Sequence, residues 1–240
     1  MFRVLFWIVF SQILAVSAFA ETVYFSAPDG LKVTADLQRP ATASKAAIVL
    51  FHMAGSSRGE YAKIAKTLNG LGYVTLAVDQ RSGRSSNGVV NETAKRAGKK
   101  LGYQAAIPDM KAASAWARSN LDVERVAVLG SSYSAALVLV LAGKDRQFAD
   151  AVVSYSPGEY FSDRRLVRKS LGGIEVPVLL SSARNETRQW KPFVKGVSGP
   201  VEGFIPKGSG RHGASALVSK DSKEYWKSLQ DFLAVHFPAS

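Results

Sequence analysis

Cysteine is absent from this sequence of 240 residues, and histidine occurs only three times. Without cysteine the chain forms neither a disulfide framework nor a thiolate metal site. A metal centre built on other ligands requires histidines clustered with carboxylates, and the three histidines stand apart along the chain. We therefore expect no metal site.

Acidic residues are also scarce, with 19 Asp and Glu against 31 Lys and Arg, which gives a formal net charge of +12. Such an excess favours association with anionic surfaces or polymers. The basic residues are dispersed, apart from short clusters at 99–100 and 164–169, and aromatic residues do not alternate with them as a nucleic-acid platform requires. We therefore expect no nucleic-acid partner, and the charge favours association with anionic envelope surfaces instead.

The sequence has one long apolar run, and it lies at the N-terminus. Arg3 precedes an almost wholly apolar stretch over residues 4–16, and Ala18-Phe19-Ala20 fits a small-x-small cleavage site. The alternative is an uncleaved membrane anchor, because the run is nearly long enough to span a bilayer. Since polar, strand-like sequence follows at once, we predict that residues 1–20 are a cleaved signal peptide. Export without cysteine is typical of a bacterial periplasmic or secreted protein.

Beyond residue 20, apolar runs of strand length alternate with segments of helical periodicity. Two alternating runs flank a Pro-Asp-Gly turn and predict an antiparallel hairpin over residues 22–25 and 31–37. Further strands are predicted at 46–51, 73–78, 126–129, 149–155, 177–181 and 201–205. Helices are predicted at 61–69, 105–119, 135–142 and 222–236. Residues 80–103 are rich in Ser, Gly, Asn, Lys and Arg, and we predict a long mobile loop there.

This alternation predicts a single α/β domain over residues 21–240. We expect a mostly parallel central sheet of about eight strands, with an N-terminal antiparallel hairpin and helices on both faces. In such sheets reactive groups gather at the carboxyl ends of the strands. Residues that follow each strand are therefore the candidates for a functional site, and residues 80–103 and 156–173 are expected to shape its pocket.

A tight strand-to-helix turn is predicted at Gly130-Ser131-Ser132-Tyr133-Ser134, which joins an apolar run to an Ala/Leu-rich helix. The backbone is crowded two residues either side of such a turn, so Gly130 and Ser134 meet a need for small side chains. This arrangement is typical of a nucleophile elbow, which presents a hydroxyl, here that of Ser132, beside the amide-rich start of a helix. The alternative is an ordinary serine-rich helix cap.

A serine nucleophile needs a base within hydrogen-bond reach and an acid that orients the base. We predict His212 as the base, because it lies in a glycine-rich loop after the last strand, from which it would reach the nucleophile. An ordinary surface histidine is the alternative interpretation. His52 ends an early strand and favours a structural role, and His236 lies in the last turn of the closing helix.

The orienting acid is expected after the next-to-last predicted strand, where the first carboxylate is Glu186. Glu159, after the preceding strand, is the second candidate, and Asp163 is the third. The alternative role for Glu186 is a solvated loop residue paired with Arg184 or Arg188.

Two backbone amides are needed to bind the oxyanion that forms when a carbonyl is attacked. The amide of Tyr133, directly after the predicted nucleophile, is the first candidate. The second is expected in the Gly/Ser-rich loop after residues 46–51, where we predict Ala54, with Met53 as the alternative.

The chain resembles the α/β-hydrolase superfamily, most of all the small branch without a lid around the dienelactone hydrolases. Five segments carry this resemblance in the family's order: His52-Met53-Ala54-Gly55-Ser56, Asp79-Gln80-Arg81-Ser82-Gly83-Arg84-Ser85, Gly130-Ser131-Ser132-Tyr133-Ser134, Asn185-Glu186 and Arg211-His212-Gly213. Met53, Ser82 and Ser134 stand where many members have glycine. The dienelactone hydrolases proper use a cysteine nucleophile, which this chain lacks. Asp79 and Arg81 are expected to be structural, as is Asp109.

The sequence therefore predicts an exported serine hydrolase that cleaves a carboxylic ester or thioester of a small-molecule substrate. An acyl-enzyme would form through Ser132, His212 and Glu186, and no cofactor is expected. A non-catalytic envelope binding protein on the same scaffold is the alternative. A peptidase ranks third, because the chain lacks the extra domain that prolyl-peptidase relatives use.

Overall fold

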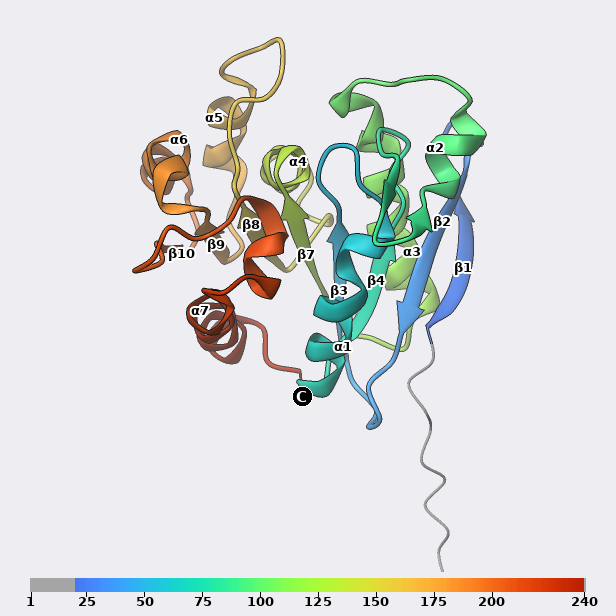
Figure 1. The fold of residues 1–240 in the computed structure, drawn as a ribbon, viewed down its shortest axis with the longest axis horizontal. Coiled ribbons are helices and arrows are strands. Elements are labelled where there is room, and N and C mark those ends of the chain that lie inside the picture. Colours follow the sequence, from blue (N-terminus) through green and yellow to red (C-terminus); the bar gives the residue numbers. More distant parts are fainter. Residues whose placement is uncertain (1–19, 240) are drawn as a thin grey trace, which may run out of the picture.

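The structure, a computed structural model, describes residues 20–239, so the predicted signal peptide lies outside the described residues apart from Ala20. An eight-stranded sheet runs through the molecule in the order β1-β2-β4-β3-β7-β8-β9-β10, with β1 and β10 at opposite edges (Figure 1). Its strands are β1 (Glu21–Ser26), β2 (Lys32–Gln38), β3 (Ala46–Phe51), β4 (Val74–Val78), β7 (Arg125–Ser131), β8 (Ala151–Tyr155), β9 (Val178–Ser181) and β10 (Val201–Phe204). The predicted α/β-hydrolase fold is confirmed.

The sheet is antiparallel only at its N-terminal edge. The predicted hairpin forms, with Glu21 opposite Leu37, and β2 then pairs antiparallel with β4. The pairs β4–β3, β3–β7, β7–β8, β8–β9 and β9–β10 are all parallel. The carboxyl ends of six strands therefore meet along one edge of the sheet, where the loops that follow them lie side by side.

Helices cover both faces of the sheet, as predicted. One face packs against α3 (Ile107–Asn120), α4 (Tyr133–Ala142), α5 (Leu166–Ser170) and α6 (Thr187–Trp190), and the other against α1 (Ala62–Gly70) and α7 (Ser222–His236). All ten residues of α4 are buried, which explains why its sequence is apolar on every side. In α7 only one stripe is apolar, and Tyr225, Leu229 and Phe232 of that stripe are buried.

The prediction of a long mobile loop over residues 80–103 is wrong. The segment contains a small hairpin, β5 (Ser85–Ser86) with β6 (Val89–Val90), and a capped helix, α2 (Glu92–Ala97). Asn91 caps α2 by accepting the Ala94 amide at 2.7 Å, and buried Asp79 accepts the Glu92 amide at 2.8 Å. These anchors come from single polar residues, so hydrophobic periodicity does not reveal them.

In the described part of the chain, no helix combines the length and the hydropathy that crossing a bilayer would need.

Candidate active site

Ser132 occupies a strained turn between β7 and α4. Its backbone has φ 60° and ψ −119°, a conformation that non-glycine residues adopt rarely and mostly at functional sites. A Cβ atom on Gly130 would lie 2.5 Å from the carbonyl oxygen of Ser134, so glycine is required there. The crowding expected of a nucleophile elbow is therefore present, and it leaves the Ser132 side chain at the carboxyl end of the sheet.

Ser134, where many relatives have glycine, uses its hydroxyl to tie the turn to neighbouring strands. It donates to the carbonyl oxygen of His52 at 2.6 Å and accepts from Nε2 of Gln80, also at 2.6 Å. The same Gln80 nitrogen lies 3.0 Å from the hydroxyl of Tyr133. The loops after β3 and β4 and the start of α4 are thus joined by buried hydrogen bonds.

The structure brings Ser132, His212 and Glu186 into one chain of hydrogen bonds. Nε2 of His212 lies 2.8 Å from Oγ of Ser132, and Nδ1 of His212 lies 2.6 Å from Oε1 of Glu186. Ser132 is 9% exposed, and the Glu186 side chain is 19% exposed. With its proton on Nδ1, the imidazole donates to Glu186 and presents a free lone pair to the Ser132 hydroxyl.

The electrostatics of the pair match this arrangement. The hydrogen bond to Glu186 raises the pKa of His212 above its ordinary value, although partial burial opposes the shift. For Glu186, burial alone would raise the pKa, but hydrogen bonds from His212 and Ser156 outweigh burial and lower it. Glu186 is thus held ionised beside the ring that it orients.

Ser156 is a site residue that the sequence analysis missed. Its hydroxyl donates to Oε2 of Glu186 at 2.6 Å and accepts the Gly213 amide at 2.9 Å, so it links the acid to the loop that carries His212. Like Ser132, it has a positive φ of 60°. Its position directly after β8, at the carboxyl end of a strand, is the sequence signal that would have found it.

Gly213 fixes the other side of His212. Its φ is 67°, and a Cβ atom there would lie 2.4 Å from Oγ of Ser131. That hydroxyl accepts the next amide, of Ala214, at 2.9 Å. The backbone after His212 therefore packs directly against the elbow, which places the imidazole over Ser132.

The other candidate residues lie elsewhere. His52 is fully buried, accepts the Gln80 amide on Nε2 at 3.0 Å, and has a pKa lowered to about 4 by burial. His236, the last residue of α7, contacts Glu202 of β10 through its Nε2 at 3.0 Å. Glu159 accepts the amides of Val167 and Arg168 at the start of α5. Asp163 pairs with Lys169 at 2.7 Å.

The two predicted oxyanion donors on the early loop differ in what they bind. The amide of Met53 donates to Oε2 of Glu60 at 2.8 Å, so it is engaged within the protein. The amide of Ala54 donates to no acceptor among the described residues. Tyr133 is the first residue of α4, and its amide therefore has no partner within the helix. Glu60 was not a sequence candidate; burial raises its pKa.

Asp79, Arg81 and Asp109 have the structural contacts expected of them. Asp79 binds Arg58 at 2.6 Å through the guanidinium and at 2.8 Å through the backbone amide. Arg81 binds buried Asp109 and also Asp29 in the turn of the N-terminal hairpin. No cluster of metal-ligating side chains occurs within residues 20–239.

Solved structures of hydrolases share this fold at low sequence identity. A dienelactone hydrolase from Anabaena variabilis is 18% identical, with a TM-score of 0.70 over 91% of this chain and 98% of that one. An esterase from Pyrococcus furiosus is 17% identical, with a TM-score of 0.70 over 95% of both chains. An acylaminoacyl peptidase from Pyrococcus horikoshii is 16% identical, with a TM-score of 0.69 over 92% of this chain but 42% of that one.

The comparison with curated proteins gave no match. A family profile described as X-Pro dipeptidyl-peptidase (S15 family) matches residues 29–192, which include Ser132 and Glu186. The matched range runs from the N-terminal hairpin turn through α6 and so covers more than half of the sheet. The chain belongs to this S15 family, within the α/β-hydrolase superfamily, and is similar to the dienelactone hydrolases.

Proposed function

We propose that the protein is a serine hydrolase that cleaves a carboxylic ester or thioester through an acyl-enzyme. The observation that carries this proposal is the hydrogen-bonded series Ser132–His212–Glu186, with distances of 2.8 and 2.6 Å. These distances lie within the range that nucleophile activation by a neighbouring base needs. The strained backbone of Ser132 and the fold that this chain shares with esterases add support.

In the proposed reaction, Oγ of Ser132 attacks the carbonyl carbon while Nε2 of His212 takes its proton. Glu186 stabilises the resulting imidazolium through the proton on Nδ1. The amides of Ala54 and Tyr133 bind the oxyanion, a role that Met53 cannot share while its amide is bound to Glu60. His212 then gives the proton to the departing alkoxide or thiolate, and a water activated by the same ring hydrolyses the acyl-enzyme.

The first test is the activity of Ser132→Ala and His212→Ala on short p-nitrophenyl esters. We expect turnover to fall by at least about 10⁴-fold in both variants, because the nucleophile and the base act only together. His236→Ala is the matched control and should keep the wild-type rate. A Ser132→Ala variant that retains wild-type turnover would rule out Ser132 as the nucleophile.

A non-catalytic binding protein on the same scaffold remains the alternative from another class. A fluorophosphonate probe separates the two, because it modifies only an activated serine. Stoichiometric labelling of the folded protein that is lost in Ser132→Ala supports the enzyme. Absence of labelling in the folded protein supports the binder.

A peptidase activity has one observation in its favour, which is membership of a family named for X-Pro dipeptidyl-peptidases. The same nucleophile and base would serve amide cleavage. Rates measured on X-Pro p-nitroanilides and on p-nitrophenyl esters show whether the enzyme prefers the amide bond or the ester bond. We expect the ester to be the better substrate, and the reverse ranking would assign a peptidase.

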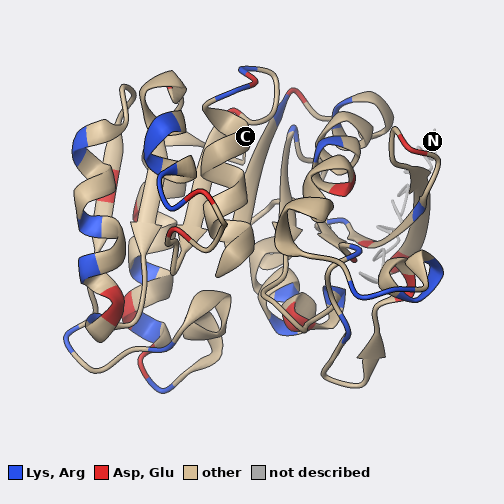
Figure 2. Ribbon diagram, turned by 90° about the horizontal axis from the view of Figure 1, so that it is seen from above, with Lys and Arg blue, Asp and Glu red and all other residues tan. Residues whose placement is uncertain are grey.

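We also propose that the protein is exported after cleavage at Ala20 and acts in the periplasm or outside the cell. The support is the Arg3-led apolar run and the Ala18-Phe19-Ala20 site in the sequence. N-terminal sequencing of the protein recovered from the envelope should begin at Glu21. Lys and Arg are spread over many elements of the molecule (Figure 2), so any attraction to anionic envelope surfaces should be diffuse and salt-sensitive.

A further inference from the structure

A cavity of about 770 Å³ lies beside the loop after β3 and is walled by the segment that follows β4. It has room for part of a small ligand. Among its lining residues are Ala54, Ser82, Arg84, Asn91, Lys100 and Tyr103. Most of its wall therefore comes from residues 81–103, the segment expected to shape the pocket.

Two residues that line the cavity, Ser82 and Tyr103, contact Tyr133, the residue after Ser132. Ser82 lies 2.7 Å from the Tyr133 hydroxyl, and the ring of Tyr103 stacks on that of Tyr133 with centroids 4.6 Å apart. Ala54, whose amide is a proposed oxyanion donor, belongs to the same wall. A ligand bound in the cavity would therefore lie next to the reacting carbonyl.

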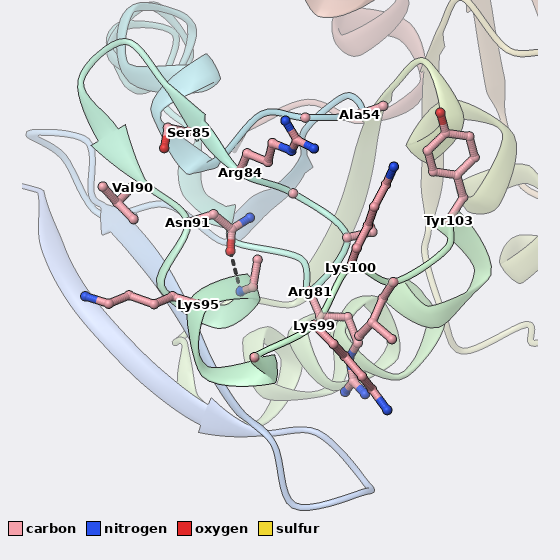
Figure 3. A pocket seen from close by; sticks show the side chains of 16 residues that line it. Ala54, Arg81, Arg84, Ser85, Val90, Asn91, Lys95, Lys99, Lys100 and Tyr103 are labelled. Atoms are coloured by element: carbon pink, nitrogen blue, oxygen red, sulfur yellow. Dashed lines mark hydrogen bonds between the residues drawn. The ribbon is translucent and has the colours of Figure 1, made fainter.

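Cationic side chains line this cavity, and the lining includes neither Asp nor Glu. Figure 3 shows Arg84 and Lys100 extending toward Ala54, whereas Lys95 and Lys99 extend away from it. Among the described residues, Arg84 and Lys100 form no ion pair, while Arg81 is already paired with Asp29 and Asp109. Two exposed positive charges without an ion-pair partner among the described residues thus extend toward the oxyanion loop.

Arg84 is held in place by its backbone. Its amide donates to the carbonyl oxygen of Ser56 at 2.8 Å, and its own carbonyl accepts the Asn91 amide at 2.7 Å. The neighbouring Gly83 has no room for a side chain, since a Cβ atom would lie 2.3 Å from the Ser56 oxygen. The Arg84 backbone is therefore fixed between the oxyanion loop and α2, and its side chain is exposed and accessible to an anion.

A second, smaller hollow shares Tyr103 with the cavity. It has a volume of about 240 Å³ and is lined in part by Tyr160 and Phe161. The Tyr160 hydroxyl donates to the carbonyl oxygen of Ser156 at 2.7 Å, which holds the ring beside the residue that binds Glu186. The site thus has an aromatic side suited to a short acyl chain and a basic side suited to an anion.

We propose that the basic cavity binds a phosphate group on the alcohol portion of the substrate, through Arg84 and Lys100. The inference rests on the proposed esterase function and specifies its substrate class. A phosphate monoester carries nearly two negative charges at neutral pH and matches two cations, whereas a carboxylate would neutralise only one. The acyl chain lies in the hollow beside Tyr160, and Ser132 attacks the ester carbonyl between the two.

The test compares two esters that differ only in the phosphate: 1-butyrylglycerol 3-phosphate and 1-butyrylglycerol. We expect kcat/KM for the phosphorylated ester to exceed that for the neutral one by about 10- to 100-fold, the usual effect of one or two charge-assisted hydrogen bonds. Raising the ionic strength should shrink this ratio. Equal kcat/KM values for the two esters in an active enzyme would overturn the proposal.

Single substitutions show which side chains cause the preference for the phosphorylated ester. Arg84→Gln and Lys100→Gln should each lower the ratio by about tenfold, with the neutral ester as the internal reference. Lys95→Gln and Lys99→Gln are the matched controls, because they remove the same charge from side chains directed away from Ala54. If all four substitutions lowered the ratio equally, the preference would reflect overall positive charge, and the subsite would be refuted.

A binding measurement tests the phosphate subsite independently of the proposed esterase activity. Glycerol 3-phosphate is titrated into the Ser132→Ala protein by calorimetry, with glycerol as the neutral reference. Binding that Arg84→Gln or Lys100→Gln weakens about tenfold supports the subsite even if neither ester is hydrolysed. Loss of hydrolysis alone would then count against the esterase and not against the cavity. Absence of saturable binding to a folded protein would overturn the subsite, and co-sedimentation with anionic vesicles alone would assign the cations to a membrane surface.

Discussion

The hydroxyl of Ser156 holds two parts of the site at once, the carboxylate of Glu186 and the amide of Gly213. Ser156→Ala removes one of the two donors to the ionised acid and leaves a buried amide without its acceptor. We expect kcat/KM on p-nitrophenyl esters to fall about tenfold, in line with the loss of one hydrogen bond to a charged group. Ser154→Ala, two residues earlier on β8, is the control and should keep its kcat/KM. Unchanged kcat/KM in Ser156→Ala would show that Glu186 is oriented by His212 alone.

The pH profile tests the pair Glu186 and His212. His212 must be neutral to accept a proton, and Glu186 raises its pKa above 6.5. Activity should therefore be lost as the pH falls through a value above 6.5. Removing the carboxylate in Glu186→Gln lowers the His212 pKa, so the acid limb of kcat/KM should move to lower pH. The plateau should fall by about 10²- to 10⁴-fold, because the ring loses its orienting partner.

Glu159→Gln is the control for that profile, since Glu159 was the competing candidate for the acid. Its carboxylate accepts two amides at the start of α5, and the acid limb should stay where it is in the wild type. A limb that moves in Glu159→Gln and stays in Glu186→Gln would reverse the two assignments.

Strand-end position brought the right residues among the candidates, but it did not separate Glu186 from Glu159, which also follows a strand. Ser132, Glu186 and His212 each follow a strand, and parallel strands bring such residues to one edge. Ser156 obeys the same rule but was missed because serine after a strand is common. Glu60 lies in the short helical turn Arg58–Tyr61, and only the fold places its carboxylate against the Met53 amide. Its contact required knowledge of how the chain packs.

Among the elements, the segment between β4 and α3 depends on one side chain more than its composition suggests. Asn91 caps α2 through Oδ1, and its Nδ2 donates to the Gln80 carbonyl at 2.9 Å. Asn91→Ala should lower the free energy of unfolding by about 2–3 kcal/mol, from the lost cap and a buried carbonyl left without its donor. Urea unfolding measures this loss, and limited proteolysis should cut the variant within residues 85–103.

Asn185→Ala gives the matched comparison for Asn91, because Asn185 is exposed and lies on another loop. Its unfolding free energy should stay within about 0.5 kcal/mol of the wild type. Equal losses in the two variants would mean that α2 is held by its packing and not by its cap.

The elements that the sequence predicted well are those with strong periodicity. Buried strands such as β3 and β7 and amphipathic helices such as α7 appear within a few residues of the expected bounds. The hairpin β5–β6 and helix α2 were missed because each is shorter than the window in which periodicity is visible. Helix α2 is held by its cap Asn91, the residue just before it, and by Asp79, which accepts the Glu92 amide only once the chain has folded.

At the scale of the whole molecule, Arg81 connects three elements that are far apart in the sequence. It pairs with Asp29 in the N-terminal turn and with Asp109 in α3, and it is only 9% exposed. Arg81→Met leaves the buried Asp109 carboxylate without its partner, which typically costs about 3–5 kcal/mol. We expect that loss in urea unfolding, in a single transition over the proposed domain of residues 21–240.

Arg84→Met, three residues later and free of ion pairs among the described residues, controls for the loss of positive charge. It should change the unfolding free energy by less than about 0.5 kcal/mol. A separate early transition in Arg81→Met would instead show that the N-terminal hairpin unfolds by itself.

Strands β3 and β7 pair at the middle of the sheet, and the residues proposed to act in the reaction follow one or the other of them. Ser132, Glu186 and His212 lie after β7 in the sequence. The loop that contains Ala54 and the residues that line the basic cavity all lie before α3. Apart from the oxyanion amide of Ala54, the reacting groups and the cations proposed to bind the substrate therefore come from separate parts of the sequence. Substitutions confined to Arg84 and Lys100 should therefore change the preferred substrate without disturbing the elbow, whereas Gln80 and Arg81 must be kept because they bind Ser134 and Asp109.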